Sequence, residues 1–336
     1  MTELEVVAKI SFKEAITSVD FVDFLGDGID SVVITTLNGD VRVLELSSEA
    51  LSSLAEACRI ENLPPVSSMD IGDVTGDGIP DIIIGGLDNT LRIAHYEDGC
   101  LSEIAMSPLG TLPTALCATN VMGANNAEVI VSTNDNALRC FGWYDSALDK
   151  LAHKVIDYPV FSIHPLGGKG VPYSRFVFGD DSEHLFVYRY ADDRLHEAVR
   201  TGTKGKVNLV SAGSVSGDRY DEIVTICDKN LTLYGIVQGR IEQFDNLRGP
   251  SPVTGLKVGH VSDDTSSPGQ ILVTHADSSI GLLSLEGRQL VPNTALKTQE
   301  SALESLIAFG DINGDEKVEI VQAVGNTLHI ITVSAN

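Results

Sequence analysis

The 336-residue chain is poor in basic residues: 23 Lys and Arg stand against 47 Asp and Glu, giving a formal net charge of −24 at pH 7. Non-specific affinity for nucleic acids comes mainly from Lys and Arg, so this surface repels DNA, RNA and anionic lipid. We therefore expect no nucleic-acid partner, and proteins, cations or basic peptides instead. Two alternative explanations of the negative charge are solubility alone and adaptation to high salt.

Long apolar runs and paired cysteines are missing as well. No stretch approaches the length of a membrane span, and Met1–Lys9 lacks the basic and apolar regions of a signal peptide. The five cysteines are odd in number and none has CxxC spacing, which argues against a disulfide framework or a zinc site. Free thiols fit a reducing compartment. We expect a cytoplasmic protein with no membrane segment.

Recognisable catalytic motifs are absent too. The sequence contains no HExxH, GxSxG, Walker A or Rossmann pattern. Gly202–Lys206 is rich in glycine and lysine but lacks the P-loop spacing, so we interpret it as a turn. These absences predict a protein that is not an enzyme.

What the sequence does contain is a repeat. Seven segments begin with a polar residue and continue with apolar, mostly β-branched or aromatic residues; their first residues lie 50, 47, 47, 47, 48 and 49 positions apart. They are Ser31–Ile34, Asp81–Ile84, Glu128–Val131, Arg175–Phe178, Glu222–Thr225, Gln270–Val273 and Glu319–Gln322. A second apolar segment follows each after a hairpin signal such as Asn38-Gly39-Asp40. Strand-only repeats of about 40–50 residues are typical of β-propeller blades.

The pattern predicts an all-β fold: residues 1–336 as a single seven-bladed β-propeller with four-stranded antiparallel blades. Repeats begin near residues 13, 64, 112, 158, 206, 252 and 302. The last repeat ends after its third strand, near Val333, whereas residues 3–12 resemble an outer strand ahead of the first blade. We expect this N-terminal strand to complete blade seven, because closing the ring removes exposed sheet edges.

Strands within a blade are called A to D from the centre outward. The A–B loop of blade two offers side-chain oxygens at positions 1, 3, 5 and 9, from Asp73, Thr75, Asp77 and Asp81. Glycines between them permit a sharp turn, and Ca²⁺ binds six to eight oxygens in loops of similar spacing. Blade seven repeats the pattern with Asp311, Asn313, Asp315 and Glu319. Both loops are candidate Ca²⁺ sites.

The same loop is weaker in the other blades. Blade one has Asp23, Asp27 and Asp30, and blade five has Ser214, Ser216, Asp218 and Glu222. The alternative for every copy is turn chemistry alone, because Asp and Asn accept hydrogen bonds from nearby backbone N–H groups.

At these residues the chain resembles the FG-GAP repeat family, the propeller of integrin α-subunits and its relatives. Asp73–Gly85 and Phe309–Asp315 carry the resemblance. It implies a protein-binding propeller, in some members with Ca²⁺ in the A–B loops. Without a signal peptide or membrane span, the chain is similar to cytosolic FG-GAP propellers, which are scaffolds in larger assemblies. The resemblance thus implies a protein partner.

Our leading functional prediction is a non-catalytic intracellular interaction platform, monomeric or part of a larger complex. One alternative is a propeller enzyme, a hydrolase or lyase, with Asp20, Asp70 or Asn208 directed into the central channel. Another is a purely structural subunit. Chain direction places the D–A and B–C loops on one face, a plausible docking surface with varied side chains. These are Pro64, Pro65, Tyr158, Lys204, Lys206, Arg248, Pro250 and Pro252.

One slot of strand C holds arginine in three blades: Arg42, Arg92 and Arg139. Either the three form a basic strip, or each pairs with an acidic residue of the adjacent blade.

Overall fold

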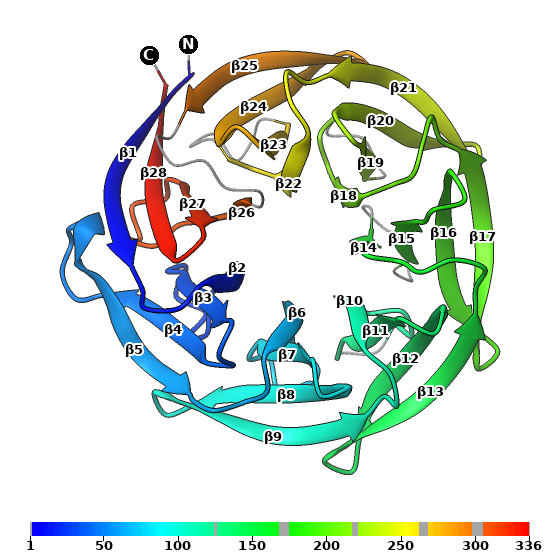
Figure 1. Ribbon diagram of the computed structural model, residues 1–336, viewed down its shortest axis with the longest axis horizontal. Coiled ribbons are helices and arrows are strands. Elements are labelled where there is room, and N and C mark those ends of the chain that lie inside the picture. The colour runs from blue at the N-terminus through cyan, green and yellow to red at the C-terminus, as the bar shows by residue number, and fades with distance from the viewer. Residues whose placement is uncertain are drawn as a thin grey trace.

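The computed structural model describes residues 2–123, 126–167, 175–216, 221–261, 268–297 and 305–335. Twenty-eight strands and one short 3₁₀-helix make up the regular structure of these ranges. Strands β2 to β25 form blades one to six, four strands to a blade in chain order, whereas β26, β27, β28 and β1 form blade seven. Figure 1 shows the seven sheets arranged in a ring, with the first strand of each nearest the centre.

The bounds of the strands follow the repeat. Blade one comprises β2 (Ile16–Val22), β3 (Ser31–Thr36), β4 (Val41–Leu46) and β5 (Leu54–Ile60). Blade two comprises β6 (Val66–Gly72), β7 (Asp81–Gly86), β8 (Thr90–Glu97) and β9 (Cys100–Pro108). Blade three comprises β10 (Pro113–Thr119), β11 (Glu128–Thr133), β12 (Ala137–Tyr144) and β13 (Ala147–Val155). Blade four comprises β14 (Ile163–Leu166), β15 (Arg175–Gly179), β16 (His184–Ala191) and β17 (Arg194–Gly202).

The remaining blades keep the same order. Blade five comprises β18 (Leu209–Gly213), β19 (Glu222–Cys227), β20 (Asn230–Val237) and β21 (Arg240–Arg248). Blade six comprises β22 (Val253–Gly259), β23 (Gln270–His275), β24 (Ser279–Glu286) and β25 (Gln289–Lys297). Blade seven comprises β26 (Ser305–Gly310), β27 (Glu319–Val324), β28 (Thr327–Ala335) and β1 (Thr2–Ser11).

Strand β1 closes the ring as predicted. It pairs antiparallel with β28 from Thr2↔Ala335 to Ser11↔Thr327. Blade seven therefore contains both ends of the described chain, and the two termini lie side by side at its outer edge (Figure 1). The predicted all-β, seven-bladed architecture with four-stranded antiparallel blades is confirmed.

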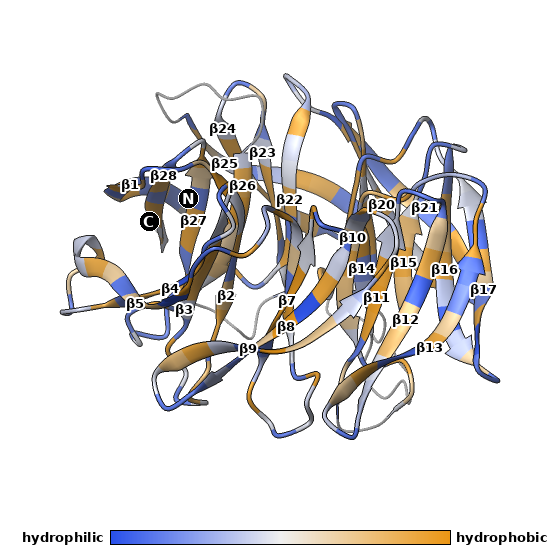
Figure 2. Cartoon of the chain, turned by 60° about the horizontal axis from the view of Figure 1, so that its bottom comes forward, coloured by the Kyte–Doolittle hydropathy of each residue, from blue (hydrophilic) through white to orange (hydrophobic). Residues whose placement is uncertain are grey.

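The core lies between the blades. Seven clusters of buried apolar residues occur in the described part of the chain, one at each blade interface. Strand B is buried on both faces, which is why its segments are continuously apolar rather than alternating. Figure 2 shows apolar colour along the strands and polar colour in most loops. Contacts between neighbouring blades thus stabilise the ring.

Tight turns explain the hairpin signals. Asn89, Asn136, Asp228 and Ser278 have positive φ in the B–C hairpins, where Asn and Asp are tolerated. The predicted outer strand of blade one is β5, preceded by the 3₁₀-helix Leu51–Ser53. In the described ranges, no helix is long and apolar enough to cross a membrane. All five cysteines are free thiols.

Candidate functional site

The A–B loop of blade two is built around its own backbone. The carboxylate of Asp73 accepts hydrogen bonds from Gly76 N at 2.7 Å and Gly78 N at 2.9 Å. Asp77 Oδ1 accepts one from Ile79 N at 2.9 Å. Gly76 and Gly78 have φ of +81° and +90°, a conformation that glycine adopts without strain. Two of the predicted ligands therefore shape the turn.

Asp81 is fully buried at the start of β7 and has two kinds of partner. Its Oδ2 accepts hydrogen bonds from Val74 N and Thr75 N, both at 2.9 Å. Its Oδ1 lies 2.7 Å from Nδ1 of His95, and His95 Nε2 lies 3.4 Å from Asp77 Oδ2. Burial raises the pKa of Asp81, against the hydrogen bond with His95. The imidazole therefore occupies the space in front of both carboxylates.

The loop of blade seven repeats this backbone arrangement without a histidine. Asp311 accepts hydrogen bonds from Gly314 N at 2.7 Å and Glu316 N at 2.8 Å, and Asn313 Oδ1 from Asp315 N at 3.0 Å. Glu319 Oε2 accepts one from Ile312 N at 3.2 Å. Burial raises the pKa of Glu319 to about 7.

In the described structure the carboxylates of these two loops are not gathered into a metal-binding group. Within the described ranges, no group of three or more His, Cys, Asp or Glu side chains is positioned to hold a metal ion. Thr75 Oγ1 is buried without a hydrogen-bond partner, and it is the one predicted blade-two ligand that does not bond to backbone through its side chain. Calcium at either loop stays a prediction.

The weaker copies also serve the turn. In blade one, Asp23 accepts hydrogen bonds from Gly26 N at 2.7 Å and Gly28 N at 2.9 Å. In blade five, Glu222 accepts them from Val215 N at 2.8 Å and Ser216 N at 2.9 Å. Asp218 lies outside the described residues, as does the predicted start of the last repeat near residue 302.

A second group of polar residues lies around the axis of the ring, on strand A. Lys257 Nζ of blade six lies 2.9 Å from Asp20 Oδ2 of blade one, although β26 of blade seven stands between their strands in the ring. Burial lowers the pKa of Lys257, but the carboxylates of Asp20 and Asp70 together outweigh this effect and the net shift is upward. The pair thus joins non-adjacent blades with matched charges.

Asp70 and His164 complete this axial cluster. Asp70 Oδ2 accepts a hydrogen bond from Ala118 N of the next blade at 2.6 Å, and burial raises the pKa of Asp70 to about 6. His164 Nδ1 lies 2.9 Å from Pro165 O and 3.3 Å from Ala212 N, and burial lowers the pKa of His164 to about 4. At neutral pH His164 is therefore neutral, and Asp70 can exchange a proton near pH 6.

The prediction for the axis was partly wrong. Asp20 and Asp70 lie in the cluster, but Asn208 is exposed and its Oδ1 accepts a hydrogen bond from Asp228 N at 3.0 Å, in the B–C hairpin. His164 and Lys257 were missed. All four residues occupy the same register position, because each pairs with the third residue of strand B in its own blade: Asp20, Asp70, His164 and Lys257. An alignment of the seven A strands would therefore have indicated the cluster from the sequence.

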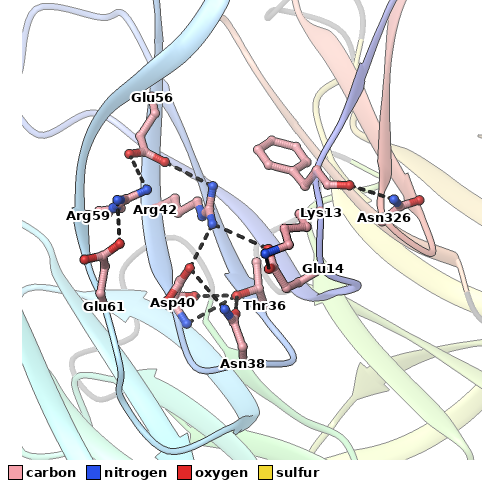
Figure 3. Close-up of polar contacts among 11 residues, drawn as sticks. Lys13, Glu14, Thr36, Asn38, Asp40, Arg42, Glu56, Arg59, Glu61 and Asn326 are labelled. Atoms are coloured by element: carbon pink, nitrogen blue, oxygen red, sulfur yellow. Dashed lines mark hydrogen bonds and ion pairs between the residues drawn. The ribbon is translucent and has the colours of Figure 1, made fainter.

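The arginine slot of strand C forms ion pairs within its own blade. Arg42 contacts Asp40 at 2.8 Å, Glu56 at 3.2 Å and Glu14 at 3.7 Å (Figure 3). Arg92 pairs with Asp88 at 2.6 Å and Arg139 with Asp135 at 2.7 Å. The prediction that each arginine pairs with an acidic residue was right, but the prediction that this residue belongs to the adjacent blade was wrong. Each arginine has an aspartate partner in the B–C hairpin, two or four residues before it. Arg42 and Arg92 have a second partner on strand D of the same blade, Glu56 and Glu103, and Glu14 lies in the connection between blades seven and one.

The face formed by D–A and B–C loops carries exposed apolar side chains. Val155, Tyr158 and Phe161 follow one another in the connection between blades three and four and are 65%, 44% and 58% exposed. Val155 also lines a cavity of about 370 Å³, together with Asp157, Asp180 and other residues. The opposite face has exposed apolar residues as well, among them Leu25 at 74% and Ile29 at 46%.

Comparison with known proteins gives no family. No family model matches the chain, and no curated protein sequence matches it. Solved structures do match. One is BBS1N in complex with ARL6DN, from a crystal soaked with mercury. Its TM-score is 0.71 and its sequence identity 12%, and the match covers 99% of this chain and 96% of that chain. The likeness establishes the fold. The same complex in a crystal soaked with lead has a TM-score of 0.70 at 12% identity, and the match covers 98% of this chain and 95% of that chain.

Proposed function

We propose that this propeller is a non-catalytic platform for protein binding, of the FG-GAP type, acting in the cytoplasm. The observation that carries the proposal is the exposure of Val155, Tyr158 and Phe161 within one short stretch of chain, the first of them lining a cavity, on a ring that is closed by hydrogen bonding between β1 and β28. Exposed apolar groups on a rigid scaffold typically mark protein interfaces. The similar propeller BBS1N was crystallised with a protein, ARL6DN, which supports the same use here.

The partner's chemistry follows from charge and shape. A surface with a net charge of −24 favours a partner of basic character through electrostatic steering. The partner would place an apolar side chain against Tyr158 and Phe161, since aromatic residues commonly anchor protein interfaces. Membership of a larger complex is compatible with this arrangement.

The test compares two faces of one molecule. The chain with Phe161→Ser should lose its partner in cross-linking and co-purification, whereas Leu25→Ser, a change at an even more exposed apolar residue of the opposite face, should retain it. Both variants should unfold at the wild-type temperature. Loss of the partner only with Leu25→Ser would move the docking site to the A–B face and contradict the proposal.

A second candidate function uses the axial cluster. Asp70, with a pKa of about 6, and neutral His164 are groups that general acid–base chemistry employs. A hydrolase or lyase acting there would lose its activity with Asp70→Asn and keep its protein partner. If the activity were unaffected by Asp70→Asn, the axial cluster would not be its site.

A further inference from the structure

One blade lacks the side chain that the others place at the arginine slot. The slot is the strand-C residue that pairs with the fourth residue of strand B, facing the preceding blade. From blade one to blade seven it holds Arg42, Arg92, Arg139, Phe186, Thr232, Gly281 and His329. Blade six therefore has no side chain at this position.

The neighbouring strand does not compensate. The strand-D partners of the slot are Arg59, Met106, His153, Arg200, Asn246, Ala295 and Lys9 in the same order. Gly281 and Ala295 are thus the smallest pair in the ring. The missing volume appears as a cavity of about 250 Å³ between blades five and six, lined by both residues.

The walls of this cavity are apolar. Leu231 and Val253 come from blades five and six, and Val273 and Leu283 from strands β23 and β24; all four are at most 8% exposed. Ala295 is exposed, so the cavity opens outward between the D strands. His275, Ser279 and Thr294 also line the cavity, but most of its lining residues are apolar, which favours an apolar ligand over water.

The mouth is positively charged in an otherwise acidic protein. Lys229 of the B–C hairpin and Arg248 at the end of β21 line the cavity, and no described residue lining it is Asp or Glu. Neither cation forms an ion pair with a described residue. Asp277, close by, already bonds to Ser279 at 2.7 Å and pairs with Lys297 at 3.7 Å. The two cations are therefore available to an anion.

We propose that this cavity binds a small carboxylic acid with an apolar body. A dry cavity of about 150 Å³ accommodates benzene, so a cavity of about 250 Å³ suits about ten carbon atoms. The body fills the space above Gly281, and the carboxylate lies at Lys229 and Arg248. This ligand site is separate from the proposed docking patch at blades three and four.

The experiment titrates octanoate against octylammonium, which has the same tail and the opposite charge, by ligand-observed NMR on the full chain. We expect octanoate to bind with a Kd of about 0.1–1 mM and octylammonium at least tenfold more weakly. Equal affinity for the two probes would overturn the anion assignment.

Two substitutions that fill the cavity provide the structural test. A side chain at Gly281 begins with Cβ 3.1 Å from Val273 Cγ2, so Gly281→Leu enters the space with a small shift of Val273. Ala295→Leu fills it from the other strand should the first variant fail to fold. Both should abolish octanoate binding while the thermal midpoint stays at or above wild type. Undiminished binding in a folded variant would refute the site.

The charged mouth has its own variant. Arg248→Gln should weaken octanoate binding by about threefold, the usual scale for one exposed ionic contact. The affinity for octylammonium should stay unchanged or increase. A variant that affected both probes equally would mean that Arg248 shapes the wall and does not recognise charge, which would contradict the proposed orientation.

Discussion

Nδ1 of His95 lies 2.7 Å from the buried Oδ1 of Asp81, and the same ring reaches Asp77 with its other nitrogen at 3.4 Å. In register, His95 stands opposite Asp81 across β7 and β8, where blades three and five have Gly142 and Gly235. A histidine at this position satisfies a buried carboxylate that would otherwise lack a partner on that oxygen. It also competes with any cation for the two carboxylates.

This competition gives the first prediction. If blade two binds Ca²⁺, millimolar Ca²⁺ should raise the thermal midpoint above that in EDTA, because a ligand of the folded state stabilises it by mass action. Asp77→Ala should remove the rise. His95→Gln, which frees an oxygen of Asp81, should enlarge it. Scanning calorimetry of the three proteins provides the measurement.

The matched control lies in blade seven, where Asp315→Ala should remove any calcium effect that survives Asp77→Ala. No shift in wild type or in His95→Gln would contradict calcium binding and leave both loops with their observed role as turns.

The axial cluster predicts opposing pH dependences. The pKa of Asp70 is raised to about 6, so the folded state binds more protons than the unfolded state between about pH 4 and 6, and this group's contribution falls as pH rises. The pKa of His164 is lowered to about 4, so the folded state binds fewer protons and its contribution rises with pH over nearly the same range. The two contributions offset each other in the wild-type protein.

Single substitutions should separate them. Relative to wild type, Asp70→Asn should gain stability as pH rises from 4 to 6, and His164→Asn should lose it, each by about 1–3 kcal/mol. Asn at position 70 keeps an acceptor for Ala118 N, Asn at position 164 offers both a donor and an acceptor near Pro165 O and Ala212 N, and the Asp20–Lys257 pair is retained. Urea unfolding at half-unit pH steps measures the differences. Parallel profiles for all three proteins would refute the assigned shifts.

The repeat made the fold predictable because every blade needs the same buried strand B. Ser31–Ile34 and its six counterparts all fall in B strands, and the closing strand is β1 (Thr2–Ser11), where residues 3–12 were predicted. The sites were harder to predict, since they depend on what faces each loop across the sheet. His95 is one strand away from the acidic loop, and nothing in the spacing of that loop indicates it.

The same reason explains the arginines. Sequence showed that Arg42, Arg92 and Arg139 share a slot, but the choice between adjacent-blade and same-blade partners depends on side-chain direction. The hairpin aspartates lie on the same face of their own sheet, where short strand-to-strand distances favour them. Gly281 occupies that slot too, and its consequence appears only when the packing against blade five is known.

The buried arginine of blade two provides a third prediction. Arg92, 8% exposed as a side chain, contacts Asp88 and Glu103, and it holds the pKa of Asp88 at about 2. Arg92→Ala should destabilise the fold by about 2 kcal/mol, because it removes both the hydrogen bonds and the packing of the aliphatic stem. Chemical denaturation measures this loss. Lys206→Ala, which removes a pair at the exposed surface, is the control and should leave the midpoint unchanged.

Ring closure gives the last prediction, which depends on the alternation of β1. Leu4 is 6% exposed and packs in the cluster between blades six and seven, whereas Val7 is 41% exposed. Leu4→Ala should therefore cost about 2–3 kcal/mol of unfolding free energy, and Val7→Ala less than about 0.5. Deleting residues 2–12 should do more: β28 becomes an unpaired edge, which invites pairing with a second molecule. Light scattering should then show dimers or aggregates, and adding a peptide of residues 2–12 should restore the monomer. A deleted chain that stays monomeric with the wild-type unfolding midpoint would show that the ring does not depend on its closing strand.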